Sequence, residues 1–364
     1  MASCLALIWD PVDPAAVAAA GDIDRHVRRG APDAPRYTVR DGCVLHDLTT
    51  GTSGRHVLPI TDGEVSGAVF GRLFRRTSAL TPAPPLSVLD QEAGRRIASS
   101  CGARLMTDYW GAYLAFLTSD DGTMVLTEPT SSIPCFYCQT HGVTLVFSHL
   151  ELCPLPDWIR FEPDLDFIVK LLAYDKIQTG QSGLRGVREL VGGCRLHVSG
   201  SRAREEVVWD PRQVALKGLE RAPAEAAACL RQTVSCVVRT WGQACPRLAL
   251  NLSGGLDSAI VAACLVQEPG ALDMRAVHFI LQGGDPPEAA LARAVALELG
   301  IELTECLIYP AEPLPTPDGH PLSARPFREF LGRRADADRR QALGLAGRTV
   351  FTGQGGDHLF LETR

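Results

Sequence analysis

The feature that most constrains the fold is a short glycine-rich segment between a predicted buried strand and a predicted helix. Its sequence is Ser253-Gly254-Gly255-Leu256-Asp257-Ser258, and it joins a strand expected at 248–252 to a helix expected at 258–267. Further elements continue the alternation: a helix at 224–241, strands at 275–281, 302–308 and 348–352, and a helix at 287–299. Strands that alternate with helices predict a parallel sheet with helices on both faces.

The segment at 253–258, named the phosphate loop, has the features of an anion site. In a strand–loop–helix crossover the loop lies at the carboxyl end of the strand, where open α/β sheets bind ligands. Gly254 and Gly255 let the backbone turn sharply, and the helix start and the hydroxyls of Ser253 and Ser258 offer donors. Asp257 in an anion site is explained by a cation that accompanies the phosphates, which predicts Mg²⁺. The alternative is an ordinary glycine turn before a helix.

A second glycine turn, Thr352-Gly353-Gln354-Gly355-Gly356-Asp357, also comes after a strand and also ends in an acid. Two such turns at the ends of parallel strands can set both carboxylates against one Mg²⁺–diphosphate. Alternatively, Asp357 only caps a helix. Glu288, in a turn between these motifs, is expected to be an ordinary first-turn acid.

The first half of the chain is predicted to be rich in β structure. Short apolar runs alternate with turn signals, with a hairpin at 113–126 and a further strand at 143–147. Short helices are expected at 91–101 and at 164–178, the second capped by Asp164. A turn and strand are expected at 186–198 and a tight reversal at 199–202. From Pro223 the pattern of expected elements changes, so a domain boundary is expected near 205–220, with two domains at 1–210 and 211–364.

Composition excludes several classes of protein. The chain has 364 residues, 46% of them hydrophobic, and a net charge of −6, so disorder and a nucleic-acid or polybasic membrane surface are not expected. No run is long enough to cross a bilayer, and the N-terminus lacks a basic leading region. Twelve scattered cysteines then indicate reduced thiols, and the expected location is the cytoplasm. Cys135 and Cys138 have no second pair at zinc spacing, so no metal function is expected there.

The two glycine turns resemble the signatures of the asparagine synthetase superfamily of N-type ATP pyrophosphatases. The first half resembles the amidotransferase-like domain of that superfamily at residues 110–115, 128–134 and 147–148. The resemblance implies an α/β protein with an N-terminal Ntn-hydrolase-like αββα domain. It also implies a C-terminal parallel-sheet ATP-pyrophosphatase domain, of the adenine nucleotide alpha-hydrolase-like kind.

The chemistry that the resemblance implies is ATP-dependent amide formation. A carboxylate attacks the α-phosphate, giving an acyl-adenylate and Mg²⁺-pyrophosphate, and an amine then displaces AMP. By resemblance, the phosphate loop (Ser253, Gly254, Gly255, Leu256, Asp257 and Ser258) holds the pyrophosphate, and Asp257 and Asp357 are the catalytic, Mg²⁺-binding acids. The nucleotide pocket is implied to be lined by Asn251, Ile280, Leu281, Thr352 and Gly353.

Three departures from the family pattern bear on function. Glutamine-dependent members have a cysteine directly after the initiator methionine, whereas this chain has Ala2 there, and Cys4 lies two residues further. Glutaminase activity is therefore expected to be absent. His358 comes directly after Asp357, where asparagine-making enzymes carry an acid, and it is expected to be a polar loop residue. The sequence stops at Arg364 and has no lysine after Lys217, so the ATP-binding domain is expected to be incomplete.

Members that lack the glutaminase cysteine join amines other than ammonia. Residues 110–113, 131–135 and 355–357 look most like lasso-peptide macrolactam synthetases, in which an Asp or Glu side chain of a precursor peptide is adenylated and its N-terminal amine closes the ring. The implied partners are a precursor peptide and a leader-processing protease, with no nucleic acid and no membrane. The alternatives are a glutamine-hydrolysing asparagine synthetase and a catalytically inactive nucleotide-binding scaffold.

Overall fold

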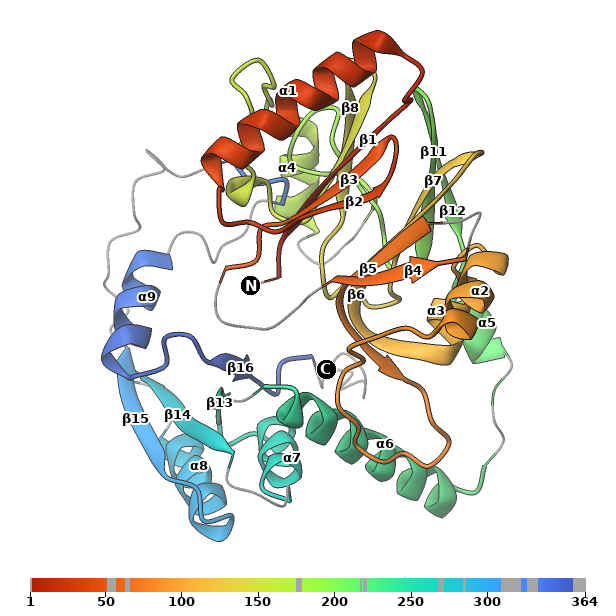
Figure 1. Ribbon diagram of the computed structural model, residues 1–364. Coiled ribbons are helices and arrows are strands. Elements are labelled where there is room, and N and C mark those ends of the chain that lie inside the picture. The colour runs from red at the N-terminus through yellow and green to blue at the C-terminus, as the bar shows by residue number, and fades with distance from the viewer. Residues whose placement is uncertain are drawn as a thin grey trace. The chain divides into compact units, whose positions relative to one another are not determined.

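The computed structural model describes residues 2–50, 57–62, 66–174, 179–216, 218, 221–245, 247–267, 272–283, 286–308, 322–325 and 333–355. The chain divides into two compact units (Figure 1). The first comprises Met1–Arg76, Pro85–Gly218 and Gly319–Phe327, and the second comprises Thr77–Pro84, Leu219–Asp318 and Arg328–Arg364. The expected domain boundary after residue 210 stays a prediction, because a compact unit need not coincide with a domain.

The first unit is built on two antiparallel sheets. One has the strand order β10 (Arg188–Glu189), β8 (Phe136–Thr140), β9 (Val143–Phe147), β1 (Cys4–Trp9), β3 (Cys43–Asp47), β2 (Arg36–Arg40). The other has the order β12 (Arg202–Val207), β11 (Cys194–Ser199), β7 (Gly122–Thr127), β6 (Tyr109–Ser119), β5 (Ser66–Arg75), β4 (Val57–Thr61). Alternate side chains of the two sheets form one core between them, with Cys4, Ala6 and Ile8 of β1 packed among Phe70, Leu114 and Phe116.

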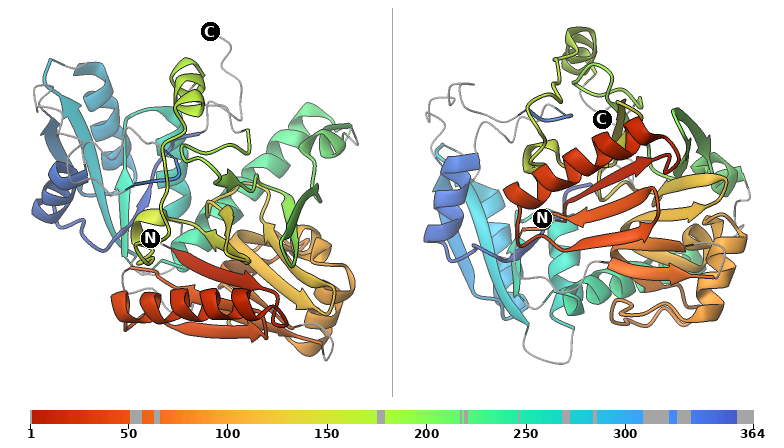
Figure 2. Two further views of the ribbon diagram at one scale, coloured as in Figure 1. Left: turned by 90° about the horizontal axis from the view of Figure 1, so that it is seen from above. Right: turned by 45° about the horizontal axis from the view of Figure 1, so that its top comes forward.

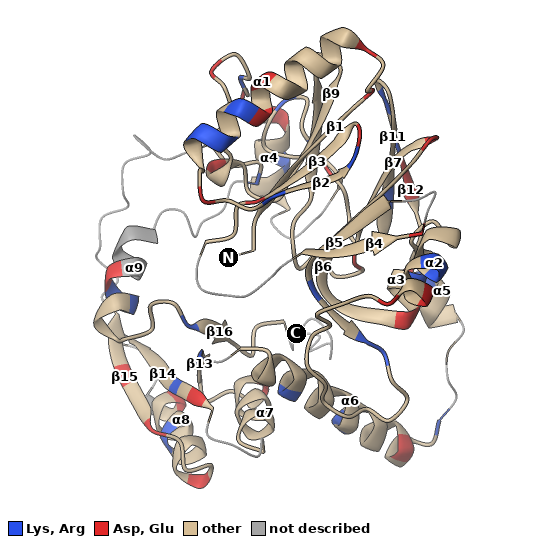
Figure 3. Ribbon diagram, viewed as in Figure 1, with Lys and Arg blue, Asp and Glu red and all other residues tan. Residues whose placement is uncertain are grey.

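Helices cover the outer faces of these sheets. The helix α1 (Pro14–Gly30) lies along the sheet that holds β1, as the red helix and strands of Figure 2 show. Asp13 caps its first turn, and Ala16, Ala20, Ile23 and Val27 face the sheet at helical spacing. Two arginines lie in its last turn, where positive charge complements the helix dipole (Figure 3).

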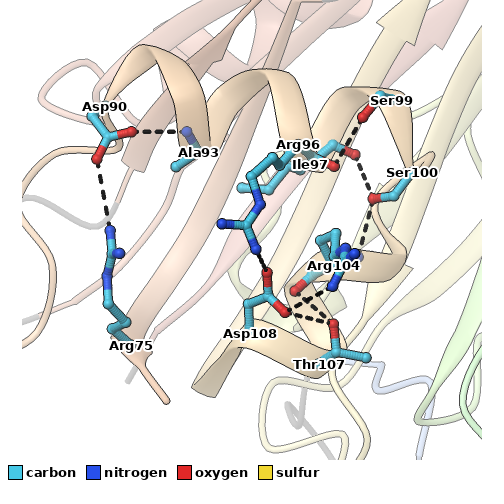
Figure 4. Close-up of polar contacts among 10 residues, drawn as sticks. All are labelled: Arg75, Asp90, Ala93, Arg96, Ile97, Ser99, Ser100, Arg104, Thr107 and Asp108. Atoms are coloured by element: carbon cyan, nitrogen blue, oxygen red, sulfur yellow. Dashed lines mark hydrogen bonds and ion pairs between the residues drawn. The ribbon is translucent and has the colours of Figure 1, made fainter. Parts of the chain in front are cut away.

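The helices α2 (Gln91–Ser99) and α3 (Ala103–Asp108) cover the other sheet and are tied together by polar contacts (Figure 4). Asp108 at the end of α3 accepts a hydrogen bond from Arg96 of α2 and forms a 3.5 Å ion pair with Arg104. The Asp90 carboxylate caps α2 by accepting from the Ala93 N–H at 2.8 Å. The unit further contains the 3₁₀ helix Leu150–Leu152 and the helices α4 (Leu165–Ala173) and α5 (Pro211–Leu216).

The second unit contains the predicted parallel sheet, which is confirmed. Its elements are α6 (Pro223–Gln243), β13 (Arg247–Asn251), α7 (Leu256–Leu265), β14 (Asp273–Leu281), α8 (Pro286–Glu298), β15 (Leu303–Ile308), α9 (Arg333–Ala342) and β16 (Thr349–Phe351). The strand order is β15-β14-β13-β16, with every pair parallel (Figure 1). The helix predicted at 258–267 begins two residues earlier than expected, so the last three residues of the phosphate loop are its first turn.

This strand order creates a switch point in the sheet. From β13 the chain moves outward through β14 to β15, and it then returns to place β16 on the other side of β13. Leu248 and Leu250 pack with Ala262 and Ala292, from α7 and α8, on one face. On the other face Ala249 and Val277 pack with Leu345, which precedes β16. Ligands of open α/β sheets bind where the strand order reverses, at the carboxyl ends of the strands.

No helix within the described ranges is long and apolar enough to cross a membrane.

Candidate functional site

The phosphate loop lies at the carboxyl end of β13 and is held by its own serines. The Ser258 hydroxyl donates to the carbonyl of Gly255 at 3.1 Å and accepts from the Ser253 N–H at 3.2 Å. The two hydroxyl oxygens lie 3.0 Å apart, and the Gly255 N–H donates to Ser253 Oγ at 3.3 Å. Both hydroxyls therefore close the loop on itself. The donors left to face an anion are the backbone N–H groups of the first turn of α7.

Gly254 is the loop position that admits no side chain. Its φ is +86°, a conformation that costs an L residue about 1–2 kcal/mol. A Cβ there would also overlap the carbonyl oxygen of Glu288 and lie 3.0 Å from the backbone nitrogen of Ala292. Gly255 differs, because its φ is −74° and a Cβ would meet only Ser253 Oγ, at 3.4 Å.

The second glycine turn packs directly on the phosphate loop. A Cβ added to Gly353 would overlap the backbone nitrogen of Ser258 and lie 2.9 Å from the Cβ of Asp257. The Gln354 N–H donates to Thr352 Oγ1 at 3.3 Å, and Gly355 takes a φ of +100°. Parallel pairing of β16 with β13, from Leu248 and Thr349 to Leu250 and Phe351, brings the two turns to the same edge of the sheet.

The remaining residues predicted for the nucleotide pocket lie at this edge too. Asn251 is the last residue of β13 and is half-buried. Ile280 and Leu281 end β14, where they pair with Leu307 and Ile308 of β15. The assignment of Asn251, Ile280 and Leu281 to a nucleotide pocket stays a prediction. The sheet topology puts them at the same edge of the sheet as the phosphate loop.

The predicted Mg²⁺ ligands are Asp257 and Asp357, and the metal site stays a prediction. Asp257 is half-buried, belongs to the phosphate loop and lies in the first turn of α7, and a carboxylate there suits a hard cation. Asp357, the second predicted ligand, lies outside the described residues, as do Gly356 and His358. Within the described part of the chain no three His, Cys, Asp or Glu side chains gather as a metal site. Asp257 alone therefore needs further ligands, which phosphates and water can supply.

Two buried polar side chains in this sheet escaped the sequence analysis. His278 in β14 donates from Nδ1 to the carbonyl of Leu252 at 2.8 Å. Arg348 precedes β16 and donates to the carbonyls of Leu248 and Asp273, at 3.2 and 2.7 Å. Hydrogen bonding from Arg348 also lowers the pKa of the Asp273 carboxyl. For both His278 and Arg348, the signal in the sequence was a single polar residue among mostly apolar neighbours, which can indicate a buried polar side chain.

Near the N-terminus, among the described residues 2–4, the structure shows no exposed nucleophile. Cys4 lies within β1 between two neighbouring strands and is fully buried, and its N–H donates to Ser148 Oγ at 2.9 Å. Burial raises the pKa of the Cys4 thiol well above its usual range. Cys4 is therefore a protonated core residue at neutral pH. Ser3 is buried beside it, and its N–H donates to Thr49 Oγ1 at 3.3 Å.

One family model matches the part of the chain that contains this site. Residues 230–361 match the asparagine synthase family. The matched segment contains the phosphate loop and four described strands of the parallel sheet, and it extends over the second glycine turn. An asparagine synthase domain implies an ATP-dependent ligase that forms amide bonds. No curated protein matches the chain in sequence.

Similarity to solved structures is weak. The allosteric regulatory enzyme of purine biosynthesis is 11% identical, with a TM-score of 0.33 over 96% of this chain and 83% of its own. The B. subtilis glutamine phosphoribosylpyrophosphate amidotransferase, complexed with ADP and GMP, is 11% identical, with a TM-score of 0.36 over 97% and 91%. The glutamine-dependent NAD⁺ synthetase of Acinetobacter baumannii, in complex with ADP, is 19% identical, with a TM-score of 0.27 over 50% and 37%. At such scores these likenesses decide nothing about the fold.

Proposed function

We propose that the chain joins a carboxylate to an amine through an acyl-adenylate and converts ATP to AMP and pyrophosphate. The observation that carries the proposal is the packing of Gly353 on Asp257 and Ser258, at the switch point of a parallel sheet. Two glycine turns meet there beside a helix N-terminus, and this arrangement suits a diphosphate.

The residues of the site have distinct roles in this proposal. The first-turn N–H groups of α7 bind the pyrophosphate part of the nucleotide, and Gly254 lets the loop pass Glu288 closely enough to aim them. Asp257, with Asp357, would hold Mg²⁺, which when bound supplies positive charge to the leaving pyrophosphate. Asn251, Ile280, Leu281, Thr352 and Gly353 would line the nucleotide pocket.

The amine is proposed to come from a source other than glutamine. Ala2 takes the place of the nucleophile of glutamine-dependent members, and Cys4 is buried and protonated. We therefore propose that the substrate is a ribosomal precursor peptide, whose Asp or Glu side chain is activated and whose own N-terminal amine closes a macrolactam. A leader-processing protease would expose that amine.

Two other functions make different predictions. A glutamine-hydrolysing asparagine synthetase would release glutamate from glutamine and would amidate aspartate. A catalytically inactive scaffold would bind nucleotide and release neither AMP nor pyrophosphate.

The test combines the full chain with Mg-ATP and synthetic peptides that have a free N-terminal amine and one internal Asp or Glu. Cyclisation is expected to give a product lighter by one water, with one AMP per product. The same peptide with Asn for Asp is the matched substrate control, because an amide cannot be adenylated at that position. Glutamate release from glutamine with no peptide product would replace the proposal by the asparagine synthetase function. ATP left intact with every substrate would favour the scaffold.

A further inference from the structure

We infer that His278 is a positioning residue of the phosphate loop, which it holds in place through the carbonyl of Leu252. The inference rests on the proposed function for its nucleotide readout only. His278 lies within β14, the residue is 4% exposed, and its Nδ1 is 2.8 Å from the Leu252 oxygen. Because a carbonyl can only accept, Nδ1 carries the proton.

Leu252 is the residue at which the strand becomes the loop. The registered pairs of β13 and β14 end at Asn251 and Val277, so Leu252 lies one residue beyond the ladder. Its N–H still donates to the Val277 carbonyl at 3.0 Å, and its side chain is fully buried in the core of the second unit. The imidazole of His278 adds a bond to its carbonyl, so β14 holds Leu252 through both of its backbone polar groups.

Ser253 connects the hydrogen-bonded Leu252 to the part of the phosphate loop that is proposed to bind nucleotide. Ser253 comes directly after Leu252, and its N–H and hydroxyl both contact Ser258 Oγ. The direction of the Leu252 carbonyl sets the plane of the peptide bond that joins it to Ser253. The ring of His278 thus fixes the orientation of the peptide bond between Leu252 and Ser253. The contacts of Ser253 with Ser258 Oγ then connect that peptide to the first turn of α7.

A purely structural role would have a different outcome on substitution. Val277 and Phe279 flank His278 in β14, Glu305 of β15 is its paired residue, and a buried polar ring is costly unless it is hydrogen-bonded. If the ring only filled space, Leu would replace it best. If it positions the loop, a side chain that keeps an N–H donor near the Nδ1 position should replace it best, and Asn is that residue.

The experiment compares three variants of the full chain with the wild type. H278L removes the N–H donor and fills the buried space with an apolar side chain. H278N keeps an N–H donor. L248A is the control, because Leu248 is buried at the opposite end of β13 and its loss weakens the same core without touching the loop. The readouts are the melting temperature, amide hydrogen exchange of a peptide that covers residues 252–258 in the ligand-free protein, and the Kd of Mg-ATP.

H278L is expected to speed exchange in residues 252–258 and to raise the Kd of Mg-ATP, each about tenfold, the ratio that one hydrogen bond to a buried group provides. H278N is expected to restore both readouts to within about threefold of the wild type. L248A is expected to lower the melting temperature and to leave both readouts near the wild type.

The inference is overturned if H278L exchanges like the wild type at 252–258, or if L248A changes both readouts as much as H278L does. It is also overturned if H278N is no better than H278L. A wild type that binds no Mg-ATP would contradict the proposed function instead. The exchange measurement would then still decide the role of His278, because it needs no ligand.

Discussion

Gly353 lies against the first turn of α7 so closely that a Cβ on it would overlap the backbone nitrogen of Ser258. These two residues are 95 positions apart in the chain, and only the parallel pairing of β16 with β13 brings them together. The contact leaves no room for a side chain between Gly353 and the first turn of α7, so a ligand bound at that first turn is also close to Gly353.

Replacing Gly353 by Ala should therefore separate the two turns. The methyl group has to displace either the turn after β16 or the backbone at Asp257 and Ser258. We expect G353A to remain folded and to raise the Kd of Mg-ATP by about tenfold or more, a loss comparable with one good hydrogen bond. Calorimetric titration measures this, with G21A in α1 as control, because a Cβ there would meet only the Arg25 side chain. Unchanged affinity in G353A would show that the second turn does not bind nucleotide.

Gly254 and Gly255 should differ in their effect on stability. G254A combines a positive φ with overlap on Glu288, and we expect it to lower the free energy of unfolding by about 2 kcal/mol or more. G255A should change that free energy by less than about 1 kcal/mol, because its backbone conformation is open to any residue. Urea unfolding of both variants checks the difference. Equal losses would contradict the positive φ at Gly254.

Arg348, which directly precedes β16, should stabilise the start of that strand. Its guanidinium is buried, donates to the backbone carbonyls of Leu248 and Asp273, and pairs with the Asp273 carboxylate. We therefore expect R348M to lower the free energy of unfolding by about 3 kcal/mol. Arg247 is the matched control, because it approaches the same Asp273 carboxylate at 3.5 Å from an exposed position. R247M should cost less than about 1 kcal/mol. Chemical unfolding of both variants decides, and similar losses would show that the burial of Arg348 is unimportant.

His46 should make the stability of the first unit depend on pH. It is buried in β3, and its Nε2 lies 2.9 Å from Asp24 Oδ1. Burial lowers the pKa of His46 below its ordinary 6.5, although the Asp24 charge opposes this. At His46 the folded protein therefore binds fewer protons than the unfolded chain below about pH 6.5, so the contribution of this residue lowers the stability as pH falls through that range.

Substitution checks the sign of this effect. H46N should flatten the fall in melting temperature between about pH 7.5 and 5.5, the window in which an unfolded histidine gains its proton. H141N, which removes an exposed imidazole at a left-handed turn, should retain the wild-type slope. A slope in H46N equal to that of the wild type would mean that another group carries the dependence.

The sequence predicted the parallel sheet and the two glycine turns because each depends on local signals: an apolar run, adjacent glycines and an amphipathic helix. It also predicted that the turns meet. The strand order could not be read in the same way, since nothing near Thr349 records that β16 pairs with β13. His278 and Arg348 were missed because their partners are carbonyls, which any residue has.

The helix α1 was missed although its signal was present. Asp13 and Pro14 form a typical helix start, and Ala16, Ala20, Ile23 and Val27 recur at helical spacing. Alanine contributes little to an apolar pattern, so the whole first half of the chain was predicted to be rich in β structure. The roles of Asp357 and His358, the cytoplasmic location and the peptide substrate stay predictions.

The proposed chemistry at the phosphate loop is best tested by ATP-dependent pyrophosphate release from the wild type, D257N and E288Q, with a peptide that the wild type cyclises. Asp257 and Glu288 are both first-turn acids, of α7 and α8, but only Asp257 belongs to the phosphate loop. Glu288 approaches Gly254 with its backbone carbonyl, and the residue is exposed. We expect D257N to lose at least about 100-fold of the rate, in the range typical for a group that stabilises charge in the transition state, and E288Q to match the wild type. Pyrophosphate release by D257N at the wild-type rate would contradict the role of the phosphate loop in catalysis.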